Sequence, residues 1–115
     1  MIFCVDIGNT NTVIGLWHEN VLAARWRIET DRGATFDDLT AKLHALMMVA
    51  GVARTDIRKV VVASDVPVWN HTWERFSREY LGKVPLFVGA DTDTGVTLAV
   101  ENPAEVGADR IVNAV

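Results

Sequence analysis

The sequence is short of cysteine and carries no strong excess of either charge. Cys4 is the only cysteine among the 115 residues, so the chain can form neither an internal disulfide nor a cluster of cysteine ligands around a metal. Its place in an apolar stretch predicts a role in the core. Eleven basic residues against fifteen acidic ones give a formal net charge of −4, which argues against broad binding to nucleic acid.

Long hydrophobic runs are also missing. No stretch approaches the roughly 20 apolar residues that span a membrane, and Asp6 interrupts the first apolar run early. No basic segment precedes that run, so a secretory signal is not expected and the predicted location is the cytoplasm. Half of the residues are hydrophobic, which predicts a folded chain. At this length we expect a single domain, residues 1–115.

The most informative stretch that is present covers the first dozen residues. An apolar run reaches Asp6, breaks at Gly8 and resumes at Val13. This pattern predicts a buried strand, a tight turn and a returning strand. Gly8 permits a positive φ and a close backbone approach, so the turn can direct amide N–H groups and the hydroxyls of Thr10 and Thr12 at an anion.

Asp6 stands beside this turn and is a candidate ligand for Mg²⁺. Hard cations prefer oxygen ligands, and they accompany phosphate groups. A plain hairpin with a solvated carboxylate at its mouth explains the same residues, because hairpins of this kind are common. The turn alone leaves both interpretations open.

The segments that follow predict two more strands and a helix. Residues 12–17 and 21–28 form the strands, joined by a loop at residues 18–20, and the alternation in the second strand is typical of half-buried strands. The helix starts after Thr35, which is spaced from Asp38 as in a capping box, and ends at Gly51. Its expected buried face consists of Phe36, Leu39, Leu43, Leu46 and Ala50.

Helices and strands alternate in the second half of the chain. A β-branched run at residues 60–63 predicts a strand covered on both faces and parallel to the first. A second helix begins near Pro67, ends at Gly82 and buries an aromatic stripe. Residues 84–88 and 96–100 predict short strands, and helices are expected to begin near Asn102 and Ala108. The aromatic stripe comprises Trp69, Trp73, Phe76 and Tyr80.

This order of elements predicts an α/β fold of the ribonuclease-H-like kind. We expect a mixed sheet with an antiparallel three-strand meander and helices on both faces. The domains of the actin, Hsp70 and sugar-kinase superfamily share this arrangement.

A second group of reactive residues is Gly107-Ala108-Asp109-Arg110. A carboxylate at a helix start is stabilised by the free N–H groups and the helix dipole, which explains Asp109 without any catalytic role. The alternative is that Asp109 is a general base and Arg110 binds an anion.

Taken together, the two motifs resemble type III pantothenate kinase. The first is Asp6-Ile7-Gly8-Asn9-Thr10-Asn11-Thr12, which is shared with the wider kinase superfamily. The second runs from Asn102 to Val115 and is highly specific at this separation. The likeness extends along the whole chain and includes Trp26-Arg27-Ile28 and Val66-Pro67.

The resemblance implies an enzyme that transfers the γ-phosphoryl group of ATP to the primary hydroxyl of pantothenate. The product is 4′-phosphopantothenate, in the first step of coenzyme A synthesis. Asp109 is the implied base and Asp6 the implied Mg²⁺ ligand. The implied phosphate loop is Asp6, Ile7, Gly8, Asn9, Thr10, Asn11, Thr12 and Val13, and the implied pantothenate site is Gly107, Ala108, Asp109 and Arg110.

Members of the family have two such domains and bind the nucleotide between them. The resemblance therefore implies that this chain is an amino-terminal domain, inactive on its own. The second domain would complete the nucleotide site, bind an activating K⁺ or NH₄⁺ and build a homodimer. Two positions depart from the family pattern: Val100 stands where members often carry Tyr, and Asp65 where Val is more usual.

Two other functions stay open at this point. Asp6 and Asp65 are placed as the two metal-binding carboxylates of a ribonuclease-H-like nuclease would be, although the Thr- and Asn-rich turn and the acidic balance argue against it. The other function is a non-catalytic regulator of the accessory transcription factor type. No basic stripe or DNA-reading helix supports direct contact with DNA, and no membrane partner is expected.

Overall fold

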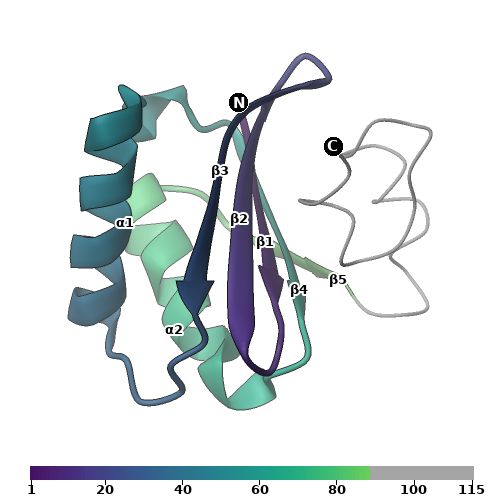
Figure 1. Ribbon diagram of the computed structural model, residues 1–115, viewed down its shortest axis with the longest axis vertical. Helices are drawn as coiled ribbons and strands as arrows, with labels where there is room; N and C mark the ends of the chain where they lie inside the picture. The colour runs from purple at the N-terminus through teal and green to yellow at the C-terminus, as the bar shows by residue number, and fades with distance from the viewer. Residues whose placement is uncertain (89–115) are drawn as a thin grey trace.

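Five strands form one mixed sheet in the computed structural model, which describes residues 1–88 (Figure 1). Their order across the sheet is β3-β2-β1-β4-β5. The first three strands along the chain pair antiparallel, whereas β4 pairs parallel to β1 and β5 parallel to β4. The predicted meander and the predicted parallel fourth strand are both confirmed. The strands are β1 (Ile2–Ile7), β2 (Asn11–His18), β3 (Val21–Glu29), β4 (Lys59–Ser64) and β5 (Leu86–Val88).

The hairpin between β2 and β3 is tight and contains a bulge. Glu19 and Asn20 both have positive φ, 49° and 68°, as a two-residue type I′ turn requires. The pairing shifts by one residue between Trp17, which faces Leu22, and Leu16, which faces Ala24, so Ala23 of β3 is the extra residue. Such a bulge changes which residues face each other along the rest of the two strands.

Helix α1 (Phe36–Ala50) begins and ends at the predicted residues. The backbone N–H of Asp38 donates to the Thr35 hydroxyl (3.2 Å), and the N–H of Thr35 donates to the Asp38 carboxylate (3.1 Å). Gly51 ends the helix with a φ of 73°.

The buried face of α1 differs in part from the predicted one. Leu39, Leu43 and Met47 are buried, whereas Ala50 is exposed. The prediction omitted Met47, although it lies four residues after Leu43 and so faces the same way. Leu46, one residue before Met47, is only half-buried at the edge of this face.

The predicted second helix consists of three consecutive segments, η2 (Pro67–Trp69), α2 (Asn70–Arg75) and the π-helical η3 (Phe76–Leu81). Gly82, with a φ of 72°, ends them as expected. The aromatic stripe is confirmed as core: Trp69, Trp73 and Phe76 are buried, and their rings meet edge to face at centroid distances of 5.7 and 5.6 Å. A separate short turn, η1 (Arg54–Asp56), precedes β4.

Both α1 and α2 lie on the same side of the sheet (Figure 1). The prediction of helices on both faces is therefore not met within residues 1–88. The strand predicted at residues 96–100 and the helices predicted near Asn102 and Ala108 lie outside the described residues. The helix-covered face of the sheet buries Phe3, Val5, Ile7, Ile14, Leu16, Val60 and Val62. The opposite face buries Cys4, Val13, Trp17, Val61, Ala63 and Val88.

Strand β5 is shorter than predicted. The strand predicted at residues 84–88 begins only at Leu86, since Pro85 has no N–H to donate to a neighbouring strand. In the part of the chain that the structure describes, no helix has the length and apolar character needed to cross a bilayer.

We expect Leu43→Ala to destabilise the chain by about 2–5 kcal/mol, because it leaves a cavity between α1 and the sheet. Val49→Ala on the same helix is the matched control, since Val49 is 90% exposed. Unfolding in guanidinium chloride, followed by circular dichroism, measures both. Equal unfolding midpoints for the two variants would show that α1 does not stabilise the core.

Candidate functional site

The first motif lies where the parallel strands β1 and β4 end side by side. Ile7 pairs with Ser64, and the N–H of Asp65 donates to the Ile7 carbonyl at 2.9 Å. Asp6, which is half-buried, and Asp65, which is exposed, therefore lie at the same edge of the sheet. Ligands of open α/β sheets bind at the carboxyl ends of the parallel strands, so this edge is the expected site.

A three-residue turn, residues 8–10, joins β1 to β2 at this edge. The Gly8 N–H donates to the Asn11 carbonyl at 3.0 Å, and a Cβ on Gly8 would lie 3.0 Å from that same oxygen. Gly8 is therefore needed for close approach of the backbone. Gly8 does not adopt the positive φ that a glycine permits; the described glycines with positive φ are Gly51 and Gly82.

The carbonyl groups of this turn all accept hydrogen bonds from one neighbouring segment, residues 30–32. The Thr30 hydroxyl donates to the Gly8 carbonyl (2.7 Å), and the Thr30 N–H donates to the Thr10 carbonyl (2.9 Å). The Arg32 guanidinium donates to the Asn9 carbonyl (3.4 Å) and to the Asn9 side-chain oxygen (3.1 Å). These contacts of Thr30 and Arg32 were not predicted from the sequence, because they join residues far apart along the chain.

The direction of the carbonyls determines the direction of the amides. A trans peptide unit points its C=O and its N–H in opposite directions, and no peptide bond among the described residues is cis. The N–H groups of Asn9 and Thr10 therefore point away from segment 30–32, and within residues 1–88 neither has a hydrogen-bond partner. Adjacent amides directed to the same side in this way favour an anion.

The other side chains of the predicted phosphate loop differ in their exposure to solvent. Asn9, Thr10 and Asn11 are exposed, so their side chains can meet a ligand. Thr12 is fully buried and its hydroxyl lies 2.8 Å from that of Thr30, so it faces into the fold and not toward an anion, contrary to expectation. Two further members, Ile7 and Val13, are buried and support the turn by packing on opposite faces of the sheet.

Asp6 fits the predicted role of a magnesium ligand. Its strand neighbours are Val13 and Ala63, so it lies on the face of the sheet opposite the helices, at the end of β1. Within residues 1–88 no three His, Cys, Asp or Glu side chains are grouped closely enough to hold a metal ion. One carboxylate nevertheless suits Mg²⁺, which usually binds one or two carboxylates and completes its shell with water and substrate phosphates.

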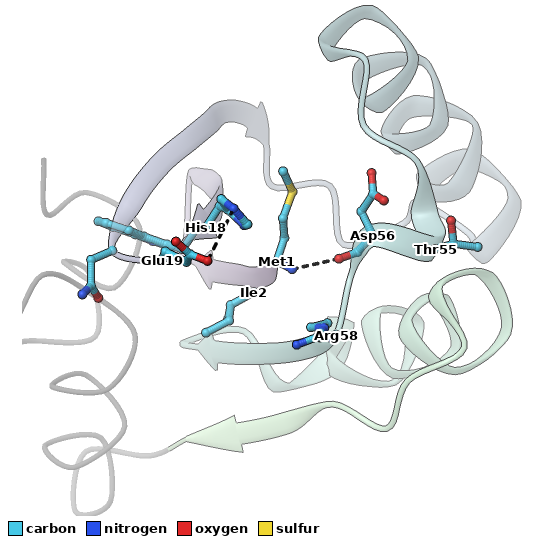
Figure 2. Close-up of a pocket in the computed structure, with 9 residues that line it drawn as sticks. Met1, Ile2, His18, Glu19, Thr55, Asp56 and Arg58 are labelled. Atoms are coloured by element: carbon cyan, nitrogen blue, oxygen red, sulfur yellow. Dashed lines mark hydrogen bonds and ion pairs between the residues drawn. The ribbon is translucent and has the colours of Figure 1, made fainter.

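The larger of two described hollows, about 860 Å³, lies at the opposite end of the sheet (Figure 2). There the Met1 ammonium donates to the Asp56 carbonyl at 2.8 Å, and His18 and Glu19 face each other at 4.0 Å. These charged side chains are exposed and make no buried polar site. The smaller hollow, about 510 Å³, borders segment 30–32 and the start of α1, and carries four carboxylates from Glu29, Asp31, Asp37 and Asp38.

Cys4 takes no part in this chemistry. Its side chain is fully buried, and desolvation raises the pKa of the thiol, only partly offset by the charge of Lys59. The predicted core role is confirmed. His44 on α1 is exposed and hydrogen-bonds with the Tyr80 hydroxyl at 2.7 Å.

The second motif, Gly107-Ala108-Asp109-Arg110, lies outside the described residues, as does Val100. The structure therefore does not relate Asp109 to the turn.

Known proteins of one family match this chain over nearly its whole length. The family model for type III pantothenate kinase matches residues 2–115. Curated type III pantothenate kinases of Syntrophotalea carbinolica, Geobacillus thermodenitrificans and Anaeromyxobacter dehalogenans are 48%, 45% and 42% identical over all 115 residues. The chain spans 45% of the length of each of these relatives.

A solved structure shares the fold. The crystal structure of a ROK hexokinase from Thermus thermophilus superposes with a TM-score of 0.59 at 13% identity, covering 84% of this chain and 36% of that one. At this identity the likeness concerns the fold alone, and it confirms the predicted class of fold.

We expect Gly8→Ala to destabilise the chain by about 1–3 kcal/mol, because the new methyl group forces the Asn11 carbonyl aside. Gly33→Ala is the matched control, since a Cβ there lies at an ordinary 3.6 Å from the Asp31 carboxylate. Denaturant unfolding gives the stabilities, and amide NMR shifts of Asn9 and Thr10 report the turn. Unchanged shifts in Gly8→Ala would contradict the close approach.

Proposed function

The chain belongs to the type III pantothenate kinase family, and we propose that it forms the phosphate-binding half of an enzyme that phosphorylates pantothenate with ATP. The observation that carries this proposal is the turn at residues 8–10, where the Asn9 and Thr10 amides point away from segment 30–32 at the carboxyl edge of the sheet and have no partner among residues 1–88. Phosphoryl transfer needs mainly positioning and charge neutralisation, and such a turn contributes to both.

In this proposal the turn binds the phosphate chain of ATP. The N–H groups of Asn9 and Thr10 donate to phosphate oxygens, and the exposed side chains of Asn9, Thr10 and Asn11 add further donors. Asp6 would hold Mg²⁺ beside them, and a bound Mg²⁺ would supply positive charge to the phosphates.

The acceptor side depends on the second motif. Gly107-Ala108 and Arg110 bind pantothenate, and Asp109 accepts the proton of its primary hydroxyl. The hydroxyl oxygen bonds to the γ-phosphorus, the bond from phosphorus to the bridging oxygen breaks, and ADP leaves. The products are 4′-phosphopantothenate and ADP, and the reaction opens coenzyme A synthesis.

We further propose that residues 1–115 act as an amino-terminal domain together with a second one. The chain spans 45% of its curated relatives, which supports this division. A second domain would complete the nucleotide site and bind a monovalent cation, K⁺ or NH₄⁺, and the intact enzyme would be a homodimer. A cytoplasmic location stays a prediction.

A metal-dependent nuclease is the alternative. Asp6 and Asp65 do lie at the same edge of the sheet, as such an enzyme requires. The family match and the direction of the turn amides favour the kinase, because a nuclease of this type needs carboxylates more than it needs an anion-binding turn. Cleavage of a labelled nucleic acid that is lost in Asp65→Ala would favour the nuclease.

We expect Asp109→Asn to lower the turnover of the intact enzyme by about a hundredfold to ten-thousandfold, because the amide keeps the shape but cannot accept a proton. Coupled detection of ADP measures the rate. Asp37→Asn, on an exposed carboxylate at the start of α1, is the matched control and should leave turnover unchanged. Near-normal turnover of Asp109→Asn would exclude Asp109 as the base.

We also expect the 115-residue chain to fold but not to phosphorylate pantothenate at a measurable rate. Catalysis requires ATP to be held in line with the acceptor, and a misplacement of about 1 Å can cost a hundredfold. The purified chain is incubated with ATP, Mg²⁺, K⁺ and pantothenate, and phosphopantothenate is measured by mass spectrometry. Turnover equal to that of an intact two-domain kinase would mean that no second domain is needed.

A further inference from the structure

Segment 30–32 touches the phosphate-binding turn at every residue of the turn. Thr30 reaches the carbonyls of Gly8 and Thr10, and Arg32 reaches Asn9 between them. No resemblance or comparison assigns a role to either residue. The contacts join positions at least twenty residues apart in sequence, so they exist only in the folded chain.

The hydroxyl of Thr30 has a determined role in this contact. A hydroxyl carries one hydrogen, and Thr30 donates its hydrogen to the Gly8 carbonyl. The 2.8 Å contact between the hydroxyls of Thr12 and Thr30 must then have Thr12 as the donor. Both threonines are buried, with exposures of 0% and 8%, so loss of the Thr30 hydroxyl would remove the partner of the buried Thr12 hydroxyl and of the part-buried Gly8 carbonyl.

Arg32 acts at the exposed side of the same turn. Its guanidinium lies 3.1 Å from the side-chain oxygen of Asn9 and 3.4 Å from its carbonyl, so it holds both parts of that residue. Arg32 also brings a positive charge to an edge that otherwise carries the carboxylates Asp6, Asp31 and Asp65. A polyanionic ligand at the turn would be attracted by that charge.

We propose that Thr30 and Arg32 are positioning residues for the phosphate-binding turn. They hold its three carbonyls on one side, so that the amides of Asn9 and Thr10 stay directed at the phosphates of ATP. The proposal rests on the proposed function, because the ligand is the nucleotide that the kinase reaction requires. Preorganised donors bind a ligand without reordering the loop. Loss of the hydrogen bonds from Thr30 or Arg32 should therefore weaken the binding of ATP and not that of pantothenate.

The test compares matched pairs of variants in the intact enzyme. Thr30→Val removes the hydroxyl and keeps the shape, and Thr30→Ser keeps the hydroxyl. Thr72→Val makes the same change at an equally buried threonine on α2, 8% exposed, far along the chain from the turn. For Arg32→Ala the control is Arg58→Ala, which removes an exposed arginine at the opposite end of the sheet.

We expect Thr30→Val to lower kcat/KM for ATP about tenfold or more, while KM for pantothenate stays within about twofold. Thr30→Ser should restore most of the loss. Arg32→Ala should lower kcat/KM for ATP severalfold without lowering Tm, whereas the two controls should leave both KM values unchanged. If Thr30→Val fails to fold, the comparison of Arg32→Ala with Arg58→Ala tests the proposal, because both arginines are exposed and their removal should not prevent folding.

Other outcomes separate this proposal from the proposed function. If the wild type phosphorylates pantothenate and the variants match its kcat/KM for ATP, the positioning role is wrong and the kinase function stands. Thr30 would likewise have only a structural role if Thr30→Val lowered kcat/KM equally for ATP and for pantothenate, if Thr72→Val did the same, and if both losses followed the fall in Tm. If the wild type binds Mg·ATP in calorimetry but leaves pantothenate unchanged, the function is wrong, and weaker Mg·ATP binding by the variants still supports positioning. A wild type that binds no Mg·ATP overturns both.

Discussion

The structure depends on the position of β1 at the centre of the sheet. This strand pairs with β2 along one edge and with β4 along the other, and its alternate residues are buried on both faces. A strand enclosed in this way leaves polar groups only at its ends. Asp6 and the turn that follows it lie at its carboxyl end, where a carboxylate and backbone amides can remain without being buried in the core.

Because β1 pairs antiparallel with β2 and parallel with β4, segments far apart in the sequence meet at the same edge of the sheet. Antiparallel β2 returns the chain alongside β1, and β3 then carries it back so that segment 30–32 lies next to the turn. Parallel β4 ends beside β1 and adds Asp65. The turn therefore has segment 30–32 on one side and the end of β4 on the other, while α1 and α2 cover only one face of the sheet (Figure 1).

The planarity of the peptide unit lets these contacts fix the direction of the turn's N–H groups. Once donors from segment 30–32 hold the carbonyls of residues 8 and 9, the next amides must point the other way. Backbone amides, and not side-chain charges, would contact the anion here, so a chain with a net charge of −4 can still present such a site. The close approach at Gly8 keeps the turn between β1 and β2 short.

Local patterns in the sequence determined much of this protein: the strand–turn–strand start, the capping box at Thr35, the glycine at the end of α1 and the aromatic core of α2. Each of these depends on neighbours within a few residues, and the motifs at both ends of the chain identified the family.

The partner of the turn was decided only by tertiary structure. His18 pairs with Val21 in the hairpin, and continuing that register would place Glu29 opposite Thr10. The bulge between Leu16 and Trp17 shifts the pairing by one residue and places Thr30 there instead. A shift of one residue exchanges the two faces of a strand, and nothing in the local pattern of β2 or β3 specifies where a bulge occurs.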